Sequence, residues 1–182
     1  MNQLDEEQFR EFAASRMDDL RSLAYLTCGD WQAAEDAVST ALTRLYVNWK
    51  RVAVPHRYAC RVVVNAAIDE KRRPWRREHS ALAETLDRAE PDHADGFADR
   101  DRIRRALRQV PPGQRAVVVL RYYGDFSVDE VAEMQGLSPG TVKSQTARGL
   151  ATLRKLLSPQ EMPEPDEEEE RDERCAPAAD RG

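Results

Sequence analysis

Residues 126–157, FSVDEVAEMQGLSPGTVKSQTARGLATLRKLL, contain two helix signals separated by a glycine. Ser127 precedes a short segment with apolar residues at helical spacing, and Gly136 follows it. Ser138 and Pro139 then supply an N-cap and a proline at the first helical position. The stretch therefore predicts a helix, a tight turn and a second helix.

The second of these helices has an apolar face and a basic remainder. Its apolar face consists of Val142, Leu150, Leu153 and Leu157. No acidic residue occurs between 138 and 157, whereas four residues there are basic: Lys143, Arg148, Arg154 and Lys155. A helix with this charge is suited to approach a polyanion.

Short polar side chains near the start of such a helix can contact base edges, while basic side chains contact phosphates. We therefore predict a DNA-binding helix-turn-helix. Its candidate recognition residues are Thr141, Lys143, Ser144, Gln145 and Arg148. The alternative is an ordinary helical hairpin whose exposed face happens to be basic.

Composition favours a soluble, helix-rich chain of one ordinary domain or two small ones, with 182 residues, 41% of them hydrophobic and 34% charged. No apolar run approaches about 18 residues, which argues against a membrane span, and the N-terminal segment is too polar for a signal peptide. We expect a cytoplasmic protein.

Metal and cofactor chemistry are not indicated. Cys28, Cys60 and Cys175 are widely separated and have no paired spacing near a histidine, so Cys28 and Cys60 are expected to be small buried residues. We expect no metal site and no cofactor. A nucleophile with a base, or a phosphate-binding loop, is also missing from the sequence pattern, so we do not expect an enzyme.

The net charge of -5 is unevenly distributed. Residues 158–182 hold ten acids and three arginines, so the rest of the chain is mildly basic at +2. With prolines, a run of glutamates and few apolar residues, this acidic tail is predicted to be disordered. A solubilising tail is the simpler interpretation, and an intramolecular DNA mimic is the alternative.

The first half of the chain predicts three helices. Apolar spacing indicates helices over 9–27 and 31–48, with Asp30 as the N-cap of the second, and these two should form a hairpin. A third helix is predicted over 57–73, where Arg61, Asn65, Asp69 and Arg72 form a polar stripe. It leads into the basic segment 71–77, which contains Trp75 and is typical of nucleic-acid binding, although a solvated helix end is the alternative.

Residues 79–99 are rich in acids and alanine and predict a flexible linker, which leaves room for a short helical piece. Helical spacing resumes over 100–110 and is broken by Pro111, Pro112 and Gly113. The segment 114–123 is ambiguous, because its three consecutive valines favour a strand locally. With only helices around it, we predict a helix.

These elements together resemble the bacterial extracytoplasmic function (group IV) sigma factors, most closely the actinobacterial SigE family. The resemblance rests on AEDAVSTALTRLY at 34–46, on Asn65 and Asp69 in an N-x-x-x-D pattern running into RRPWRR, and on the module at 107–157. It implies an all-α protein of two small helical domains. These are a sigma region 2 bundle over 1–78 and a sigma region 4 helix-turn-helix over 100–157, joined by the linker 79–99 and followed by the tail 158–182.

The resemblance also implies partners and sites. The first domain would bind the clamp helices of the largest RNA polymerase subunit through Asp36, Thr40 and Arg44. It would open and read the minus-10 element through Tyr58, Arg61, Asn65, Asp69, Arg72 and Arg73. Asn65 would hold a base turned out of the stack, and the loop 49–55 would form the wall of its pocket. The second domain would place the candidate recognition residues in the major groove of the minus-35 element, and its side at 118–126 would meet the polymerase flap.

The expected function is thus that of an RNA polymerase sigma factor that binds core polymerase and promoter DNA and promotes promoter opening. An anti-sigma factor is a possible further partner. One rival is a stand-alone helix-turn-helix transcriptional regulator, which would bind its operator as a purified protein. A second rival, a nucleic-acid enzyme, would need a carboxylate or histidine cluster in residues 1–78.

Overall fold

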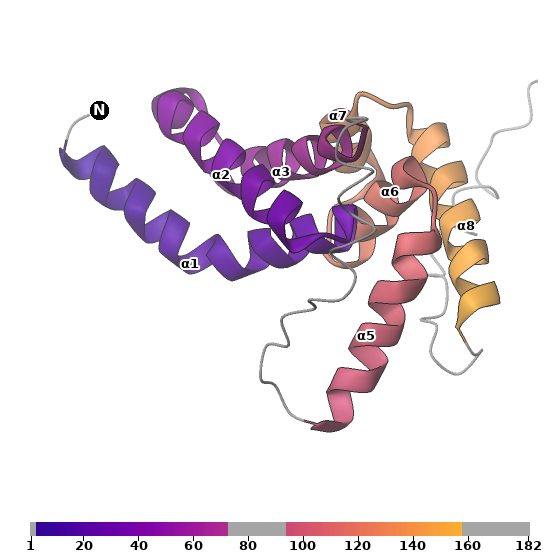
Figure 1. The fold of residues 1–182 in the computed structure, drawn as a ribbon. Helices are drawn as coiled ribbons and strands as arrows, with labels where there is room; N and C mark the ends of the chain where they lie inside the picture. Colours follow the sequence, from indigo (N-terminus) through magenta and orange to yellow (C-terminus); the bar gives the residue numbers. More distant parts are fainter. Residues whose placement is uncertain (1–2, 73–93, 158–182) are drawn as a thin grey trace, which may run out of the picture.

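The computed structural model describes residues 3–72 and 94–157, with side chains over 3–69 and 99–157. In these ranges all regular secondary structure is helical, as predicted (Figure 1). The side chain of Arg72, residues 73–93 and the tail 158–182 lie outside the described part. The predictions for Arg73, most of the basic segment, most of the linker, the tail and Cys175 therefore concern residues that the structure does not describe.

The first half is a bundle of α1 (Gln3–Cys28), α2 (Trp31–Asn48) and α3 (Pro55–Arg72), with the short 3-10 helix η1 (Trp49–Arg51) after α2. Each of the three long helices packs against the other two. Gly29, directly after α1, adopts a left-handed φ of 77°. The predicted cap of α2 is confirmed, since the Ala33 amide donates to Asp30 Oδ1 over 2.7 Å.

The bundle is held together by the apolar faces predicted for its helices. α2 contributes mostly small side chains, which let its neighbours approach closely, and its buried residues include Ala34, Val38, Ala41 and Leu45. Cys28 and Cys60 are buried as expected. At the outer end, the rings of Phe9 and Phe12 lie 5.4 and 5.7 Å from the ring of Trp49, which ties η1 to α1.

The second half contains α5 (Ala94–Gln109), α6 (Pro112–Tyr122), α7 (Val128–Gln135) and α8 (Pro139–Leu156). α6 and α7 both pack against α8, which completes the predicted helix-turn-helix. The ambiguous valine segment is a helix, as predicted. Its Val117, Val118 and Val119 are all buried, and packing on neighbouring helices outweighs the weak local preference for a strand.

Two helices begin six residues earlier than the sequence analysis predicts. α1 begins at Gln3 instead of residue 9, with Asp5 and Glu6 in its first turn, where acidic side chains favour the helix N-terminus. α5 begins at Ala94 instead of residue 100, so the last residues of the predicted linker are helical. Apolar periodicity could not locate either start, because the first turn of each helix contains a single large apolar residue, Leu4 in α1 and Phe97 in α5.

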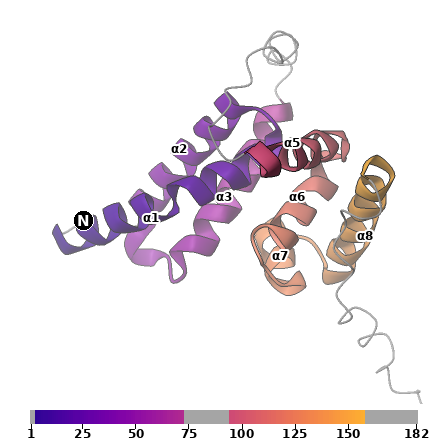
Figure 2. The ribbon, with the colours of Figure 1, turned by 90° about the horizontal axis from the view of Figure 1, so that it is seen from below.

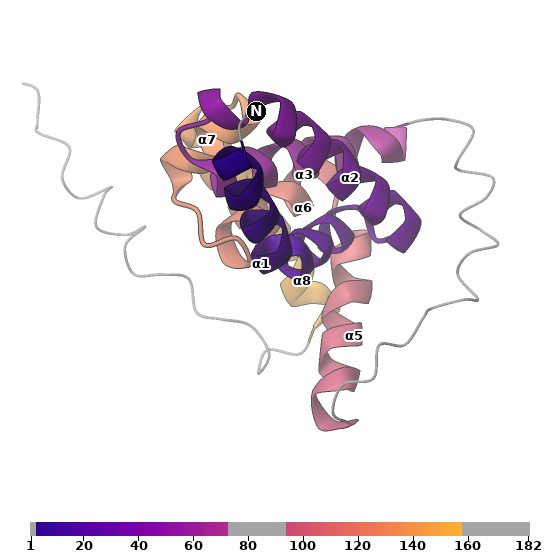
Figure 3. The same ribbon diagram turned by 90° about the vertical axis from the view of Figure 1, so that its left-hand side faces the viewer.

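The two halves pack against each other. α1 contacts α5 and α6, and α3 contacts α6 and α7 (Figures 2 and 3). The buried apolar residues of both halves form one continuous cluster. Sequence patterns had indicated two helical modules but not this association between them.

Candidate nucleic-acid interface

The turn between α7 and α8 is defined by local hydrogen bonds. The Glu130 amide donates to Ser127 Oγ over 3.2 Å, and the Ser127 amide donates to Glu130 Oε2 over 2.9 Å, which makes a capping box at the start of α7. Gly136 ends α7 with a left-handed φ of 65°. The Thr141 amide then donates to Ser138 Oγ over 3.1 Å and caps α8.

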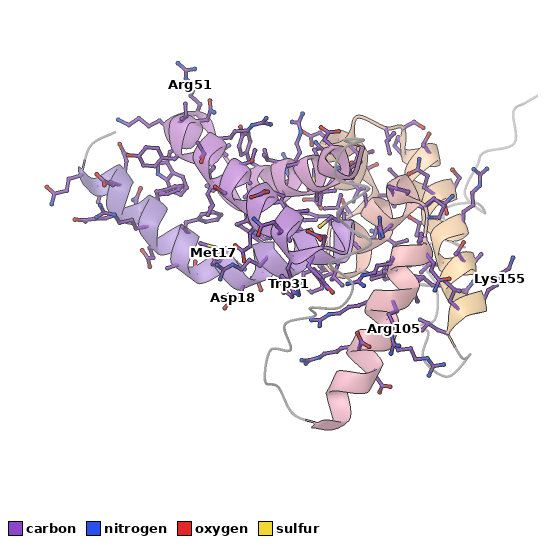
Figure 4. The ribbon with its side chains drawn as sticks, viewed as in Figure 1. Met17, Asp18, Trp31, Arg51, Arg105 and Lys155 are labelled. Atoms are coloured by element: carbon purple, nitrogen blue, oxygen red, sulfur yellow. The ribbon has the colours of Figure 1, made fainter. Side chains whose placement is uncertain are left out.

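The recognition residues predicted on α8 differ in how far they are buried. Ser144 and Arg148 are exposed, whereas Thr141, Lys143 and Gln145 are half-buried. Figure 4 shows Lys155, near the end of the same helix, projecting away from the body. α8 therefore presents a basic outer side, as predicted from its sequence.

Gln145 departs from the expectation that it points away from the apolar face. Its Oε1 atom is buried and has no hydrogen-bond partner among the described residues. That oxygen would lie 3.7 Å from a Cβ built at Gly113, where the start of α6 approaches α8 without a side chain. Gln145 thus leans onto α6, and spacing within α8 alone could not reveal this.

The polar stripe predicted on α3 is present. Arg61 and Asp69 are exposed, and Tyr58 and Asn65 are half-buried on the same side of the helix. Of Arg72 the structure describes only the backbone, and Arg73 lies outside the described residues. The four described side chains run along the outer side of α3.

A pocket with a volume of about 360 Å³ opens at the start of this stripe. Its walls come from η1 and the following loop, from α3 and from α7. The lining residues that carry charge or a ring are Arg51, Arg57, Tyr58, Arg61 and Glu133. Tyr58 and Arg61 were predicted as site residues, and Val52, Ala53 and Val54 belong to the loop predicted to form a pocket wall.

Two charged residues of the pocket were missed by the sequence analysis. Arg57 lies one turn before Arg61 on α3, and its Nη1 lies 3.3 Å from Glu133 Oε2 on α7. Helical spacing could have added Arg57 to the stripe. Nothing in the sequence could indicate Glu133, because it comes from the other half of the chain.

Next to the ion pair of Arg57 and Glu133, two rings also contact each other. The ring of His56 stacks on the ring of Phe126 with centroids 5.9 Å apart. Burial lowers the pKa of His56, and the charge of Arg16 lowers it further while Asp19 opposes it, which favours the neutral ring. Burial raises the pKa of the adjacent Cys60 thiol to about 12, so this thiol is protonated at neutral pH.

The residues predicted to contact the polymerase clamp lie along one side of α2. Arg44 is exposed, and Asp36 and Thr40 are half-buried. Gln32 Nε2 lies 3.5 Å from Asp36 Oδ1 one turn earlier. The three residues therefore lie on a common side of α2 and are at least partly accessible.

In residues 3–72 and 94–157, no helix is long and apolar enough to cross a membrane. No group of three or more histidine, cysteine or acidic side chains there could hold a metal ion.

Two family models match the chain, one in each half, in the order predicted from the sequence. Sigma-70 region 2 matches residues 12–77, and Sigma-70 region 4 matches residues 100–153. These ranges contain α3 with its stripe and α7 with most of α8.

Curated relatives match over nearly the whole chain. An RNA polymerase sigma-E factor of Streptomyces avermitilis is 34% identical over 172 residues, covering 93% of this chain and 96% of the relative. A sigma-E factor of Streptomyces coelicolor is 34% identical over 173 residues, covering 93% and 97%. The ECF RNA polymerase sigma factor SigW of Bacillus subtilis is 28% identical over 169 residues, covering 84% and 90%.

A solved structure shares the fold. The sigma factor RpoE in complex with the anti-sigma factor NepR from Bartonella quintana matches with a TM-score of 0.67 at 20% identity, covering 84% of this chain and 98% of that one. The sequence relatives and the two region matches show that the chain belongs to the extracytoplasmic function group of RNA polymerase sigma factors.

Proposed function

We propose that this protein binds core RNA polymerase, recognises minus-35 and minus-10 promoter elements and promotes opening of the promoter. The observation that supports this proposal is the presence of two separate surfaces lined by basic side chains, in the order of the sigma regions. One is the exposed basic side of α8, and the other is the arginine-lined pocket at the start of the α3 stripe. The protein has no catalytic role in this scheme, since core polymerase supplies the chemistry.

We assign the minus-35 element to residues 100–157. α8 enters the major groove with its N-terminal part, as recognition helices of this motif do. Ser144 and Arg148 are exposed and free of the protein core, so they are the strongest contact candidates, with Thr141 and Lys143 beside them. Gln145 has to turn away from α6 before it can contact a base.

We assign the minus-10 element to residues 1–78. Arg51, Arg57 and Arg61 surround the pocket with positive charge that can hold phosphates, and the ring of Tyr58 offers a surface on which a base can stack. Extruding a base costs a few kcal/mol, which such contacts offset. Asn65 follows Arg61 by one turn, and its amide can both donate to and accept from a base edge. Asp69 lies on the same side of α3, and Arg72 and Arg73, which follow it in the sequence, are assigned to the adjacent phosphates.

Core polymerase would bind two separate surfaces. The clamp helices fit the side of α2 that carries Asp36, Thr40 and Arg44. For the flap, the segment 118–126 offers Tyr122 and Tyr123, which are 37% and 46% exposed, whereas Val118, Leu120 and Phe126 are buried. Exposed tyrosines are common in protein interfaces, so the flap contact is assigned to this pair. An anti-sigma factor is a further possible partner, as in the complex of the Bartonella quintana relative.

Transcription in vitro with cognate core enzyme tests the proposal. The protein should bind promoter DNA weakly alone and direct specific transcripts only with core polymerase. If the purified chain alone binds one operator tightly and never associates with core polymerase, it is a stand-alone regulator instead.

Two variants separate the promoter elements. Arg148→Ala should weaken use of the minus-35 element and reduce the salt slope by about one unit, whereas Arg154→Ala near the end of the same helix should change both less. Asn65→Ala should leave closed-complex formation intact and reduce opening. Unchanged permanganate reactivity of melted thymines in Asn65→Ala would remove Asn65 from this role.

A further inference from the structure

Some of the arginines of α5 are used in packing on α1. Arg108 Nη2 donates to the Tyr25 hydroxyl over 2.6 Å, and the guanidinium of Arg104 lies 5.4 Å from the centre of the Tyr25 ring. The Tyr25 ring is 3% exposed and stacks on Trp31 with centroids 4.2 Å apart. These two arginines therefore help to hold α5 on the first half of the molecule.

Two further arginines of α5 reach solvent. Arg102 and Arg105 are exposed and lie about one turn apart, and the side chain of Arg105 is 66% exposed. Arg105 Nη2 lies 2.8 Å from Asp101 Oδ2 on the same helix. A surface ion pair of this kind is weak, so it leaves the guanidinium available to a stronger anionic partner. Neither arginine belongs to the promoter contacts assigned above.

α8 lies next to α5 and adds to this positive charge. The two helices are in contact, and Figures 1 and 2 show them side by side. Arg154 and Lys155 in the last turn of α8 are exposed, and Figure 4 shows Arg105 and Lys155 on the two neighbouring helices. Residues 99–109 and 150–157 together hold seven basic and two acidic residues. We call the exposed set the α5–α8 basic surface, which consists of Arg102, Arg105, Arg154 and Lys155.

The segment that follows this surface in the sequence carries the opposite charge. The tail 158–182 begins directly after Leu157, the C-cap residue of α8. Residues 164–173 of the tail hold eight acids and one arginine. A strongly acidic run therefore starts seven residues after the end of a strongly basic surface.

The acidic run is also long enough to cover that surface. Ten extended residues span up to about 35 Å, whereas residues 99–109 of α5 extend only about 17 Å along the helix. Because the tail belongs to the same chain, its effective concentration at the surface is of the order of millimolar. Ion pairs that are weak one by one can then hold the tail in place.

We propose that the acidic tail 158–182 binds the α5–α8 basic surface of its own molecule and competes there with nucleic-acid phosphates. The recognition residues in the first half of α8 lie outside this surface. The tail thus lowers the affinity for DNA of any sequence and leaves the base contacts accessible. This inference goes beyond the function proposed above, since it involves neither core polymerase nor a promoter.

A nitroxide on Cys175 locates the tail in the full chain. Cys28 and Cys60 are 4% and 2% exposed, so the reagent is directed to Cys175, and mass spectrometry verifies a single label. In nuclear magnetic resonance spectra, the amide signals of residues 100–108 in α5 should be broadened more than those of residues 3–10 in α1. Raising the salt concentration from about 0.05 M to about 0.5 M should remove this difference.

Two matched charge reversals test where the tail binds. Arg105→Glu and Arg10→Glu each break an exposed ion pair between residues four apart on a helix, with Asp101 and Glu6 as the respective partners. Only Arg105→Glu should reduce the broadening in α5. Changing the four glutamates at 167–170 to glutamine should also reduce it, and this change leaves every described helix untouched.

Binding to a labelled DNA duplex of random sequence tests the competition. By fluorescence anisotropy at low salt, removing residues 158–182 should tighten binding about three- to tenfold. This gain should be smaller in the Arg105→Glu background and unchanged in the Arg10→Glu background, because only Arg105 lies on the α5–α8 basic surface.

Equal broadening of α5 and α1 would overturn the contact and leave the tail as a solubilising segment. Broadening in a mixture of spin-labelled and isotope-labelled molecules would assign the tail to a second copy, and would overturn the intramolecular contact. Selective broadening with unchanged duplex affinity after truncation would overturn the competition. Failure to direct transcription with core polymerase, alongside selective broadening, would reject the proposed function and leave the tail contact in place.

Discussion

Gly149 lies where α8 crosses α6, and the space there admits no side chain. A Cβ at Gly149 would lie 2.7 Å from Val118 Cγ2, well inside van der Waals contact. Gly140, on the same helix, differs because the nearest atom to a Cβ there would be Ser138 Oγ at 3.9 Å. Of these two glycines, only Gly149 is therefore required by packing.

This difference predicts opposite effects of the same substitution. Gly149→Ala should lower the free energy of unfolding by about 1–3 kcal/mol through overpacking. Gly140→Ala should raise it by roughly 0.5–1 kcal/mol, because alanine loses less conformational entropy in a helix. Urea unfolding followed by circular dichroism measures both, and a stabilising Gly149→Ala would contradict the close approach of α6 and α8.

Arg115 shows a second requirement at the scale of one residue. It is 1% exposed, and its Nη1 donates to the Leu107 carbonyl over 3.2 Å across the break between α5 and α6. Burial lowers its pKa, with the charge of Arg108 acting in the same direction and Cys28 opposing them. A buried cation with a backbone partner fixes how α6 leaves α5.

α7 is the shortest of the described α-helices, and its start depends on the capping box of Ser127 and Glu130. Hydrogen bonds from the Ser127 amide and hydroxyl lower the pKa of Glu130. Because the pKa of Glu130 is lower in the folded protein than in the unfolded chain, ionised Glu130 stabilises the fold at pH values above its unfolded-state pKa. This stabilisation is lost as the pH falls through the folded-state pKa. The capping box should therefore weaken in acid.

Ser127→Ala should lower the free energy of unfolding by about 1 kcal/mol at neutral pH. The loss should become smaller in acid, where protonated Glu130 no longer accepts the Ser127 hydrogen bonds as strongly. Ser39→Ala, at an exposed position within α2, is the control and should change stability little. Chemical unfolding at several pH values measures the difference, and a pH-independent penalty would show that Glu130 does not take part.

For the whole molecule, the continuous core predicts that the two halves unfold together. Tyr25, Phe126 and Leu120 belong to one buried cluster although they come from different halves. Since stability is shared across a common core, calorimetry should show a single transition. Two separate transitions in the original protein would contradict this.

Tyr25→Phe tests the α1–α5 contact within that core. Loss of the hydrogen bond from Arg108 should lower the free energy of unfolding by about 1–2 kcal/mol. Tyr46→Phe is the control, because Tyr46 is 43% exposed. The free energy of unfolding of this variant should be nearly unchanged. Equal effects in both variants would show that the Arg108 hydrogen bond contributes nothing.

Much of the candidate interface could be predicted from local sequence. The caps Asp30, Ser127 and Ser138, the glycine at 136 and the basic side of α8 all depend on residues within about one helical turn of one another. The stripe on α3 follows from the helical period alone. The direction of the Gln145 side chain could not be predicted in this way, because it depends on Gly113 in another helix.

The amino-acid sequence by itself thus determined the helices, their caps, the order of the two sigma regions and the placement of positive charge, because each follows from near neighbours in the chain. Only the tertiary structure decided that α7 lies on α3, that Arg57 faces Glu133 and that Tyr25 receives a hydrogen bond from Arg108 83 residues away. Such contacts depend on how separate apolar faces pack, and no local period or cap specifies which faces meet.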